Sequence, residues 1–394
     1  MNRPAVSSAL PSDWTTATLL GRAWIPGKHA GPSPITVRPD GSVIDVAAIA
    51  PTVSAWLERD DVATAVRNAS GTSISTIDAL LANSRPDFDP GKPRLLAPCD
   101  LQAIKAAGVT FVESMLERVI EEQARGDASK ADAIRERIVG IIGGSLSSIK
   151  PGSQDAARIK QVLVEQGAWS QYLEVGIGPD AEIFTKTQPM ASVGHGELIG
   201  LHPKSAWNNP EPEIVLAVNS RGCIQGATLG NDVNLRDFEG RSALLLSKAK
   251  DNNASCSIGP FIRVFDSGFT LDDVRGCELA LDVFGDDAFH LAGRSSMKKI
   301  SRDPADLVAQ ALNENHQYPD GFVLFQGTMF APVKDRDAPG AGFTHHMGDR
   351  VIIATERLGA LENIVTTSDK APPWTFGVGE LFRNLALRGL LPAH

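Results

Sequence analysis

The chain has 394 residues, of which 42% are hydrophobic and 22% are charged, and its formal net charge is −9. This composition predicts a folded protein with one large domain or two to three smaller ones, and it excludes a disordered chain. No basic run offsets the acidic charge, so we expect no nucleic-acid partner. No stretch approaches ~18 consecutive apolar residues and the N-terminus lacks a signal-peptide pattern, so we expect neither a membrane span nor a leader. The 4 cysteines have no metal-type spacing, which indicates reduced thiols in a cytoplasmic protein.

Residues 1–95 are predicted to form a small N-terminal module that ends in a linker. Its first residues, 1–15, are interpreted as a loose arm. A Pro-Asp-Gly turn at 39–41 lies between two apolar runs and predicts a β-hairpin. The other elements expected in this part are strands over 23–25, 35–37 and 43–46, a capped helix over 52–68 and a Pro-rich linker over 82–97.

Residues 96–394 are predicted to form one β-rich domain, so the expected fold class is α+β. Within 100–170, apolar residues recur at three- and four-residue spacing, and we expect helices over 100–126, 127–142 and 156–167. From 171 to 394, apolar runs alternate with Gly- and Asn-rich turns. This pattern predicts strands, of which the clearest are 214–218, 322–325 and 351–354.

Two glutamates lie at the start of the strand predicted over 214–218. Glu211 and Glu213 are two residues apart, so on a strand both side chains point to the same face. Adjacent carboxylates repel each other in a partly buried site unless a cation lies between them. Oxygen ligands favour Mg²⁺, Mn²⁺ or Ca²⁺ over zinc. A solvated pair of glutamates at a strand end is the alternative interpretation.

Three further segments carry polar groups suited to the same chemistry. Asp232, directly after the strand-like run 226–229, can supply a third carboxylate, although its charged neighbours are also typical of surface salt bridges. A lysine within 248–250 can stabilise an enolate or move a proton, but most lysines are solvated. The Gly327-Thr328 turn offers a backbone N–H and a hydroxyl to a carboxylate, and an ordinary turn is the alternative.

Together these segments resemble the fumarylacetoacetate hydrolase family over roughly residues 100–370. The resemblance implies mixed sheets that form a roll, a dimeric assembly, and a Mg²⁺ or Mn²⁺ ion held by Glu211, Glu213 and Asp232. A lysine with 8 residues before Gly-Pro belongs to the family pattern, and this spacing selects Lys250 rather than Lys248. The other shared features are the Glu-x-Glu strand, the Asn-Asp-Val-x-x-Arg-Asp turn at 231–237, the Gly-Thr turn, and the segments 348–349 and 358–363.

One position departs from the hydrolytic members of that family. Members that cleave acylpyruvates carry a His and a Glu that activate the attacking water, whereas this chain has Ser114 in place of the His and keeps Glu117. Serine is no general base near pH 7, so the hydrolytic pair is broken. The segment Ala-Gly-Val-Thr-Phe at 107–111, together with 182–186 and 193–197, instead resembles the sugar-acid branch, the 2-keto-3-deoxy-D-arabinonate dehydratases.

The resemblance therefore implies a Mg²⁺-dependent dehydratase of a 2-keto-3-deoxy sugar acid. The expected substrate is a pentonate from pentose catabolism, and the expected product is 2,5-dioxopentanoate. Lys250 would stabilise the enolate, and Glu117 or Glu113 would protonate the leaving hydroxyl. The candidate substrate-binding residues are Thr328, Ser114, Arg236 and His195.

Two alternatives stay open. A C–C hydrolase would release pyruvate from an acylpyruvate or a 2,4-diketo acid, with His195 or His345 as the missing base. A protein that binds a metal or a sugar acid without catalysis is the third interpretation. For the enzyme we expect a small-molecule 2-oxo acid as substrate, a homodimer or dimer-based oligomer, and an influence of the additional helices around 127–167 on substrate choice.

Overall fold

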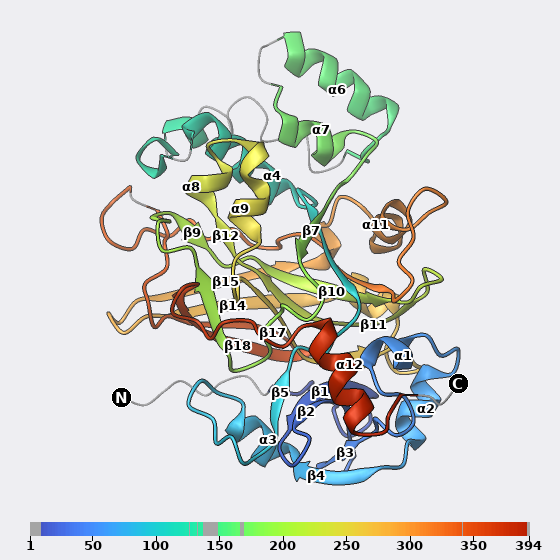
Figure 1. Cartoon of the computed structure of the whole chain (residues 1–394). Coiled ribbons are helices and arrows are strands. Elements are labelled where there is room, and N and C mark those ends of the chain that lie inside the picture. The colour runs from blue at the N-terminus through green and yellow to red at the C-terminus, as the bar shows by residue number, and fades with distance from the viewer. Residues whose placement is uncertain are drawn as a thin grey trace.

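Short apolar runs separated by turns fold into two mixed sheets, with helices gathered at one end of the molecule and around the N-terminal strands (Figure 1). The structure, a computed structural model, describes residues 9–125, 127–131, 133–136, 149–165, 169–340 and 342–391. Within these ranges, eleven strands form the larger sheet: β1 (Leu19–Ile25), β2 (Gly31–Val37), β3 (Ser42–Asp45), β4 (Thr72–Thr76), β5 (Arg94–Leu96), β6 (Ala103–Gly108), β7 (Glu182–Thr187), β10 (Pro212–Val218), β11 (Ile224–Asp232), β13 (Cys256–Val264) and β16 (Phe322–Phe325).

The smaller sheet has, in the same ranges, the five strands β8 (Leu198–Leu201), β14 (Glu278–Phe284), β15 (His290–Ser296), β17 (Arg350–Thr355) and β18 (Gly359–Thr367). β9 (Asn208–Asn209) pairs with β12 (Asn234–Leu235). The helices described are α1 (Val53–Leu57), α2 (Val62–Asn68), α3 (Ile77–Asn83), α4 (Val112–Ala124), α6 (Gln154–Glu165), α7 (Gln171–Ile177), α8 (Arg236–Glu239), α9 (Leu246–Lys250), α10 (Leu271–Arg275), α11 (Pro304–Ala311) and α12 (Val378–Leu387). None of the described helices is long and apolar enough to cross a membrane.

The core lies between the two sheets, and β10 shows why its strands have continuous apolar sequences. Ile214, Leu216 and Val218 point into the main core, which β14, β17 and β18 complete from the other sheet. Val215 and Ala217 point to the opposite face and are also buried, against β6 and α1 respectively. A strand covered on both faces needs apolar residues at every position. The strands predicted over 214–218, 322–325 and 351–354 are confirmed, as is the α+β fold with mixed sheets.

The N-terminal strands extend the larger sheet, because β1 pairs antiparallel with β13. The predicted hairpin is confirmed as β2 and β3, and Gly41 takes a positive φ of 84° in its turn. The helix expected over 52–68 is divided into α1, capped by the Thr52 side chain, and α2. The arm interpretation is wrong for 9–15, because Asp13 pairs with the buried Arg263. The division of the chain near residue 95 stays a prediction.

The helix predicted to begin at residue 100 is wrong over its first part. Residues 103–108 form β6, which pairs in parallel with β16 and antiparallel with β7. Ala and Lys favour a helix, but burial of Ile104 and Ala106 between neighbouring strands overrides that local preference. The helix itself, α4, begins at Val112. The helix predicted over 156–167 is confirmed as α6, which begins and ends two residues earlier. Much of the helix expected over 127–142 lies outside the described residues.

Candidate metal centre

Strands β10 and β11 bring three carboxylates together at one end of the larger sheet. Glu213 lies in β10 opposite Gly230, and Glu211 lies just before β10. The N–H of Asp232, at the end of β11, donates to the Glu211 carbonyl at 3.0 Å. One ligand oxygen from each of the three side chains lies within 4.8 Å of the others, and all three residues are buried. Glu211 and Glu213, which the Glu-x-Glu spacing placed on one face, thus lie in a single site with Asp232 from the neighbouring strand.

Two buried lysines contact these carboxylates. The Lys250 ammonium group contacts Glu211 and lies 3.0 Å from Asp232 Oδ2, while the Lys186 ammonium group lies 2.9 Å from Asp232 Oδ1. Burial acts to lower the pKa of Lys250, but the charges of Asp232 and Glu211 outweigh it and raise the pKa. Lys250 is therefore a firmly protonated cation inside the site. Lys248, in contrast, is exposed and lies over the Phe238 ring.

Among the residues that the structure describes, no lysine forms an ion pair with the third carboxylate, Glu213. Burial raises the pKa of Glu213 well above its usual range, and the charges of Asp232 and Glu211 raise it further. Its Oε2 accepts a hydrogen bond from the Gly327 N–H at 2.7 Å. A carboxylate in this position gains most from a nearby cation, because the cation removes the repulsion by its two neighbours. Three close oxygen donors suit a hard divalent ion such as Mg²⁺ or Mn²⁺.

An arginine from α4 contacts both the candidate metal ligand Glu211 and two further buried glutamates. Arg118 contacts Glu211, and its Nη1 lies 2.7 Å from Glu121 and 2.9 Å from Glu239. Arg236 in turn lies 3.1 Å from Glu121. Among the described residues around the three carboxylates, acidic side chains outnumber arginines and lysines by two. The groups counted are Glu121, Glu182, Glu211, Glu213, Asp232 and Glu239 against Arg118, Arg236, Lys186 and Lys250.

A small cavity opens on the carboxylates, and three of its walls come from different elements. Ser114 from α4 and Thr328 from the turn after β16, two of the predicted substrate-binding residues, line it. Glu182 and Phe184 from β7 complete it. Burial raises the pKa of Glu182 to about 7, with a further contribution from the Glu239 charge. Glu182 is thus a carboxyl group that can exchange a proton near neutral pH beside the metal ligands.

Sequence reasoning did not select Glu182 or Lys186 as site residues, although a signal was present. Glu182, Phe184 and Lys186 alternate along β7, so their side chains share one face of the strand. Glu182 and Phe184 line the cavity, and Lys186 contacts Asp232. The segment 182–186 had been singled out for its resemblance to the dehydratase branch. Its alternation of charged and aromatic residues identifies the face that carries the chemistry.

Two of the acids expected to protonate the leaving group lie away from the cavity lining. Glu113 is exposed and lies 3.0 Å from the Lys299 ammonium group. Glu117 pairs with Arg135 at 2.9 Å. Both carboxylates are on α4, but on faces that do not turn toward Glu211 as Ser114 and Arg118 do.

Arg236 and His195 also lie outside the cavity lining. The Arg236 guanidinium is buried, and besides its ion pair with Glu121 it donates to Asn209 Oδ1 at 2.9 Å and to the Pro332 carbonyl at 3.1 Å. The His195 Nδ1 accepts a hydrogen bond from the Glu362 N–H at 3.2 Å. Arg236 thus joins Glu121 to β9, whereas His195 contacts the backbone of β18.

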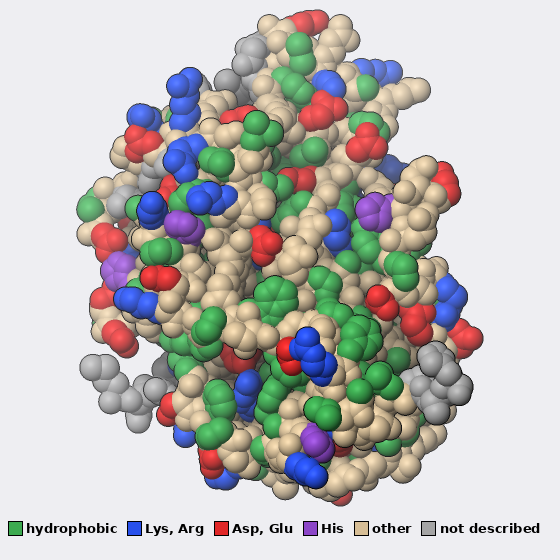
Figure 2. Space-filling model, viewed as in Figure 1, with side chains coloured by type: hydrophobic (Ala, Val, Ile, Leu, Met, Phe, Trp, Pro, Cys, Tyr) green, Lys and Arg blue, Asp and Glu red, His purple; other side chains and the backbone are tan. Residues whose placement is uncertain are grey.

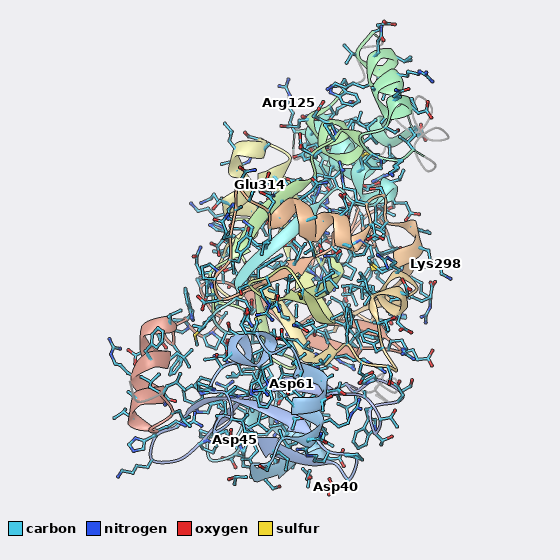
Figure 3. All side chains as sticks on the ribbon, turned by 90° about the vertical axis from the view of Figure 1, so that its right-hand side faces the viewer. Asp40, Asp45, Asp61, Arg125, Lys298 and Glu314 are labelled. Atoms are coloured by element: carbon cyan, nitrogen blue, oxygen red, sulfur yellow. The ribbon has the colours of Figure 1, made fainter. Side chains whose placement is uncertain are left out.

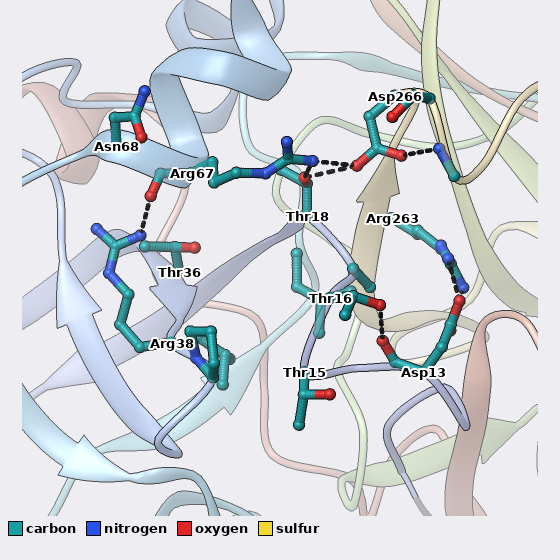
Figure 4. A pocket seen from close by; sticks show the side chains of 16 residues that line it. Asp13, Thr15, Thr16, Thr18, Thr36, Arg38, Arg67, Asn68, Arg263 and Asp266 are labelled. Atoms are coloured by element: carbon teal, nitrogen blue, oxygen red, sulfur yellow. Dashed lines mark hydrogen bonds and ion pairs between the residues drawn. The ribbon is translucent and has the colours of Figure 1, made fainter.

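A larger hollow lies elsewhere, between the N-terminal strands and the end of β13 (Figure 4). It has a volume of about 690 Å³ and is lined by three arginines and several threonines. Arg67 pairs with Asp266, Arg263 pairs with Asp13, and Arg38 donates to the carbonyls at the end of α2. Because these guanidinium groups already have protein partners, the hollow shows no group poised for chemistry.

Residues 178–366 match the family described as Fumarylacetoacetate (FAA) hydrolase C-terminal. Over this range the chain is similar to the fumarylacetoacetate hydrolase family. The matched range contains the three carboxylates, both buried lysines and the Gly-Thr turn. It begins after α4, so Ser114 and Arg118 lie outside it.

Two curated relatives are sugar-acid dehydratases. The probable 2-keto-3-deoxyxylonate dehydratase of Haloferax volcanii is 31% identical over 196 residues, which are 50% of this chain and 64% of the relative. The 2-dehydro-3-deoxy-D-arabinonate dehydratase of Saccharolobus solfataricus is 31% identical over 155 residues, which are 39% of this chain and 51% of the relative. The match thus spans less than two thirds of the length of either relative.

Solved structures of 2-keto-3-deoxy-D-arabinonate dehydratase have the same fold. The apo form covers 89% of this chain and 99% of its own, with a TM-score of 0.62 and 20% identity. The form complexed with magnesium and 2,5-dioxopentanoate gives a TM-score of 0.60 at 21% identity. The covered 89% of the chain is more than the matched family range, so the shared fold extends beyond residues 178–366.

Proposed function

We propose that the protein is a divalent-metal-dependent dehydratase of a 2-keto-3-deoxy sugar acid, with a pentonate as substrate and 2,5-dioxopentanoate as product. The observation that carries the proposal is the buried cluster of three carboxylates with the Lys250 ammonium group on two of them. The names of the two curated relatives support the substrate class. Magnesium in a structure with the same fold supports the choice of metal.

The residues present fit the metal and the reaction. Glu211, Glu213 and Asp232 would hold the cation. When bound, a divalent cation supplies Lewis-acid chemistry that makes the C3 protons next to the 2-oxo group more acidic. The Lys250 ammonium group stabilises the negative charge that develops on the 2-oxo oxygen. The Thr328 hydroxyl and the Ser114 hydroxyl, which line the cavity, orient the polar end of the substrate.

Elimination of water requires one proton to leave C3 and the C4–O bond to break. The C4 hydroxyl takes up a proton and departs as water, which leaves a C3–C4 double bond. A C5 proton then leaves while C3 takes one up, and the resulting C4–C5 enol loses its hydroxyl proton and gains a proton at C4 to give the aldehyde. A carboxyl group with a pKa of about 7 can carry such protons, and Glu182 is the group of that kind in the cavity lining. Elimination needs no attacking water, which agrees with Ser114 in the place of a water-activating His.

Product analysis tests the proposal. The protein with Mg²⁺ is incubated with a panel of 2-keto-3-deoxy pentonates and hexonates and with acylpyruvates, and the products are identified by mass. We expect loss of one water from a pentonate with no change in carbon number. Release of pyruvate from a diketo acid, faster than any dehydration, would favour the C–C hydrolase instead and would leave the metal site standing.

A further inference from the structure

The cavity at the carboxylates is too small for the proposed substrate. Its volume is about 10 Å³, which is about the space of one water molecule or one ion. A sugar acid with a five-carbon chain cannot enter such a space without movement of the walls. We therefore expect an entrance at a wall that separates the cavity from solvent. Side-chain contacts should hold this wall in place, because the hydrogen bonds between strands would not open.

A second hollow lies against one wall of this cavity. It has a volume of about 430 Å³ and is bounded by the end of α4, the start of α7 and the segment after α8. Glu239 lines both spaces. Tyr172 and Gly240 are also buried residues of the hollow, and the pKa of Tyr172 is raised by burial and by the Glu239 charge. Glu239 and Tyr172 thus form the floor of the hollow, and the cavity lies directly beneath.

The floor is held by side-chain contacts between short helices. Glu239 of α8 lies 2.9 Å from Arg118 of α4, and Arg118 contacts the metal ligand Glu211. The start of α7 is tied to α4 through Glu122, which accepts hydrogen bonds from Ser170 and Gln171. The Glu239 side chain and its pair with Arg118 therefore lie between the two spaces.

The rim of the hollow is basic. Arg125 and Arg241 are exposed and line it, and Lys248 lies on the same α8–α9 segment. Figure 3 shows Arg125 in the upper half of the molecule, far from Asp40, Asp45 and Asp61, which mark the N-terminal strands. In Figure 2, Lys and Arg side chains also gather over the region where Figure 1 places α8. Positive charge at the mouth of a site raises the encounter rate of an anionic substrate.

We propose that this hollow is the entrance through which an anionic 2-oxo acid reaches the metal ligands, with Arg125 and Arg241 at the rim and the Glu239–Arg118 pair as the inner barrier. The proposal rests on the proposed function for the nature of the substrate. In this proposal α8 and the residues that follow α8 have two roles. They form the floor and rim of the entrance, and they lead through α9 to Lys250.

A blocking experiment tests the entrance. Leu244 lies on the rim and is 95% exposed, so a bulky maleimide on L244C covers the hollow without disturbing packing. C223S removes the one exposed cysteine of the described residues. L387C in the same background, on the exposed face of α12, is the matched control. We expect the label to lower kcat/KM at least tenfold at position 244 and to leave it unchanged at position 387.

A readout without turnover separates the entrance from the reaction. Protein loaded with Mn²⁺ is mixed with excess Mg²⁺, and the released Mn²⁺ is followed by electron paramagnetic resonance. We expect labelled L244C to release Mn²⁺ several-fold more slowly than labelled L387C. If the unlabelled protein dehydrates no sugar acid, the proposed function fails and Mn²⁺ release alone decides the entrance. If the protein is active, equal turnover rates for the two labelled variants would overturn the proposal. If it is inactive, equal rates of Mn²⁺ release would overturn it.

Charge reversal at the rim tests the steering. In the pair R125E/R241E we expect kcat/KM for the acid to fall about tenfold at low ionic strength, with kcat unchanged, and the difference to shrink at high salt. The pair R383E/K298E changes the net charge by the same amount at exposed positions elsewhere. An equal fall in both pairs would show that net charge, and not this rim, guides the substrate.

Discussion

Lys250 and Lys248 lie two residues apart at the end of α9, but only one of them faces the carboxylates. The Lys250 ammonium group contacts Glu211 and Asp232, whereas Lys248 is exposed. We expect K250M to lower kcat by on the order of 10²-fold or more, since it removes a positioned charge from the reacting oxygen. K248M, measured in the same steady-state assay, should change kcat less than threefold. A larger loss in K248M would contradict this assignment of the lysine.

The three carboxylates are expected to act as one ligand set. E211A, E213A and D232A should each abolish turnover and weaken Mg²⁺ binding, measured by isothermal titration calorimetry, because each removes an oxygen donor from the cluster. Circular dichroism should show an intact fold for E213A in particular, since removing this buried acid also removes its repulsion of the other two and breaks no ion pair with the described lysines. Full activity after treatment of the native protein with EDTA would sink the metal assignment.

Two acids compete for the proton transfer to the leaving hydroxyl. Glu182 lines the cavity, whereas Glu117, the acid expected from the family pattern, pairs with Arg135. We expect E182Q to lower kcat by roughly 10²–10⁴-fold and E117Q to lower it far less, because an amide cannot donate the proton. The pKa of Glu182 is raised to about 7, so the protonated acid is lost as the pH rises through 7 and kcat should fall on that side. If E117Q proves the more damaging change, Glu117 is the donor.

At the scale of elements, sequence periodicity predicted the strands whose own residues are buried on both faces. It missed the strand whose conformation depends on pairing with strands distant in the chain. The strand at 214–218 is apolar at every position, and this pattern is typical of a strand covered on both faces. Residues 103–108 contain good helix formers, and their strand conformation comes from β16 and β7, which are distant in the chain. The same distance kept Arg118 out of the predicted site, since nothing near it in the sequence shows that it meets Glu211. For Glu182, the alternation along β7 marks a face of the strand but does not show what that face meets.

The conformation of the turn after β16 positions a backbone N–H against the candidate metal ligand Glu213. Gly327 has a φ of 99°, and a Cβ there would come within 1.8 Å of Thr110 Oγ1. Its N–H holds Glu213. We expect G327A to lower the free energy of unfolding by about 1–3 kcal/mol, because alanine is strained at this φ. Calorimetric Mg²⁺ affinity should fall as well, whereas G379A, in open space on α12, should change neither quantity.

At the scale of the whole molecule, the loop before β8 joins the two sheets. Val193 bridges to Ser257 in β13, and the Gly196 N–H donates to the Glu362 carbonyl in β18 at 2.7 Å. His195 lies between them and accepts from the Glu362 N–H through Nδ1. A protonated Nδ1 cannot accept that hydrogen bond. The neutral ring is thus part of the link between the sheets.

This link predicts a loss of stability in acid. Burial lowers the pKa of His195 below its ordinary value of 6.5, against the opposing charge of Glu362. The unfolded chain therefore binds the proton more readily, so the contribution of His195 is complete above pH ~6.5 and is lost as the pH falls toward the folded pKa. In chemical denaturation, H195Q should show a smaller drop in unfolding free energy between pH 7.5 and pH 5.5 than the native protein. H316Q, at an exposed position, is the control. An unchanged pH dependence in H195Q would mean that the ring does not titrate with folding, and the acid sensitivity would then come from the buried carboxylates.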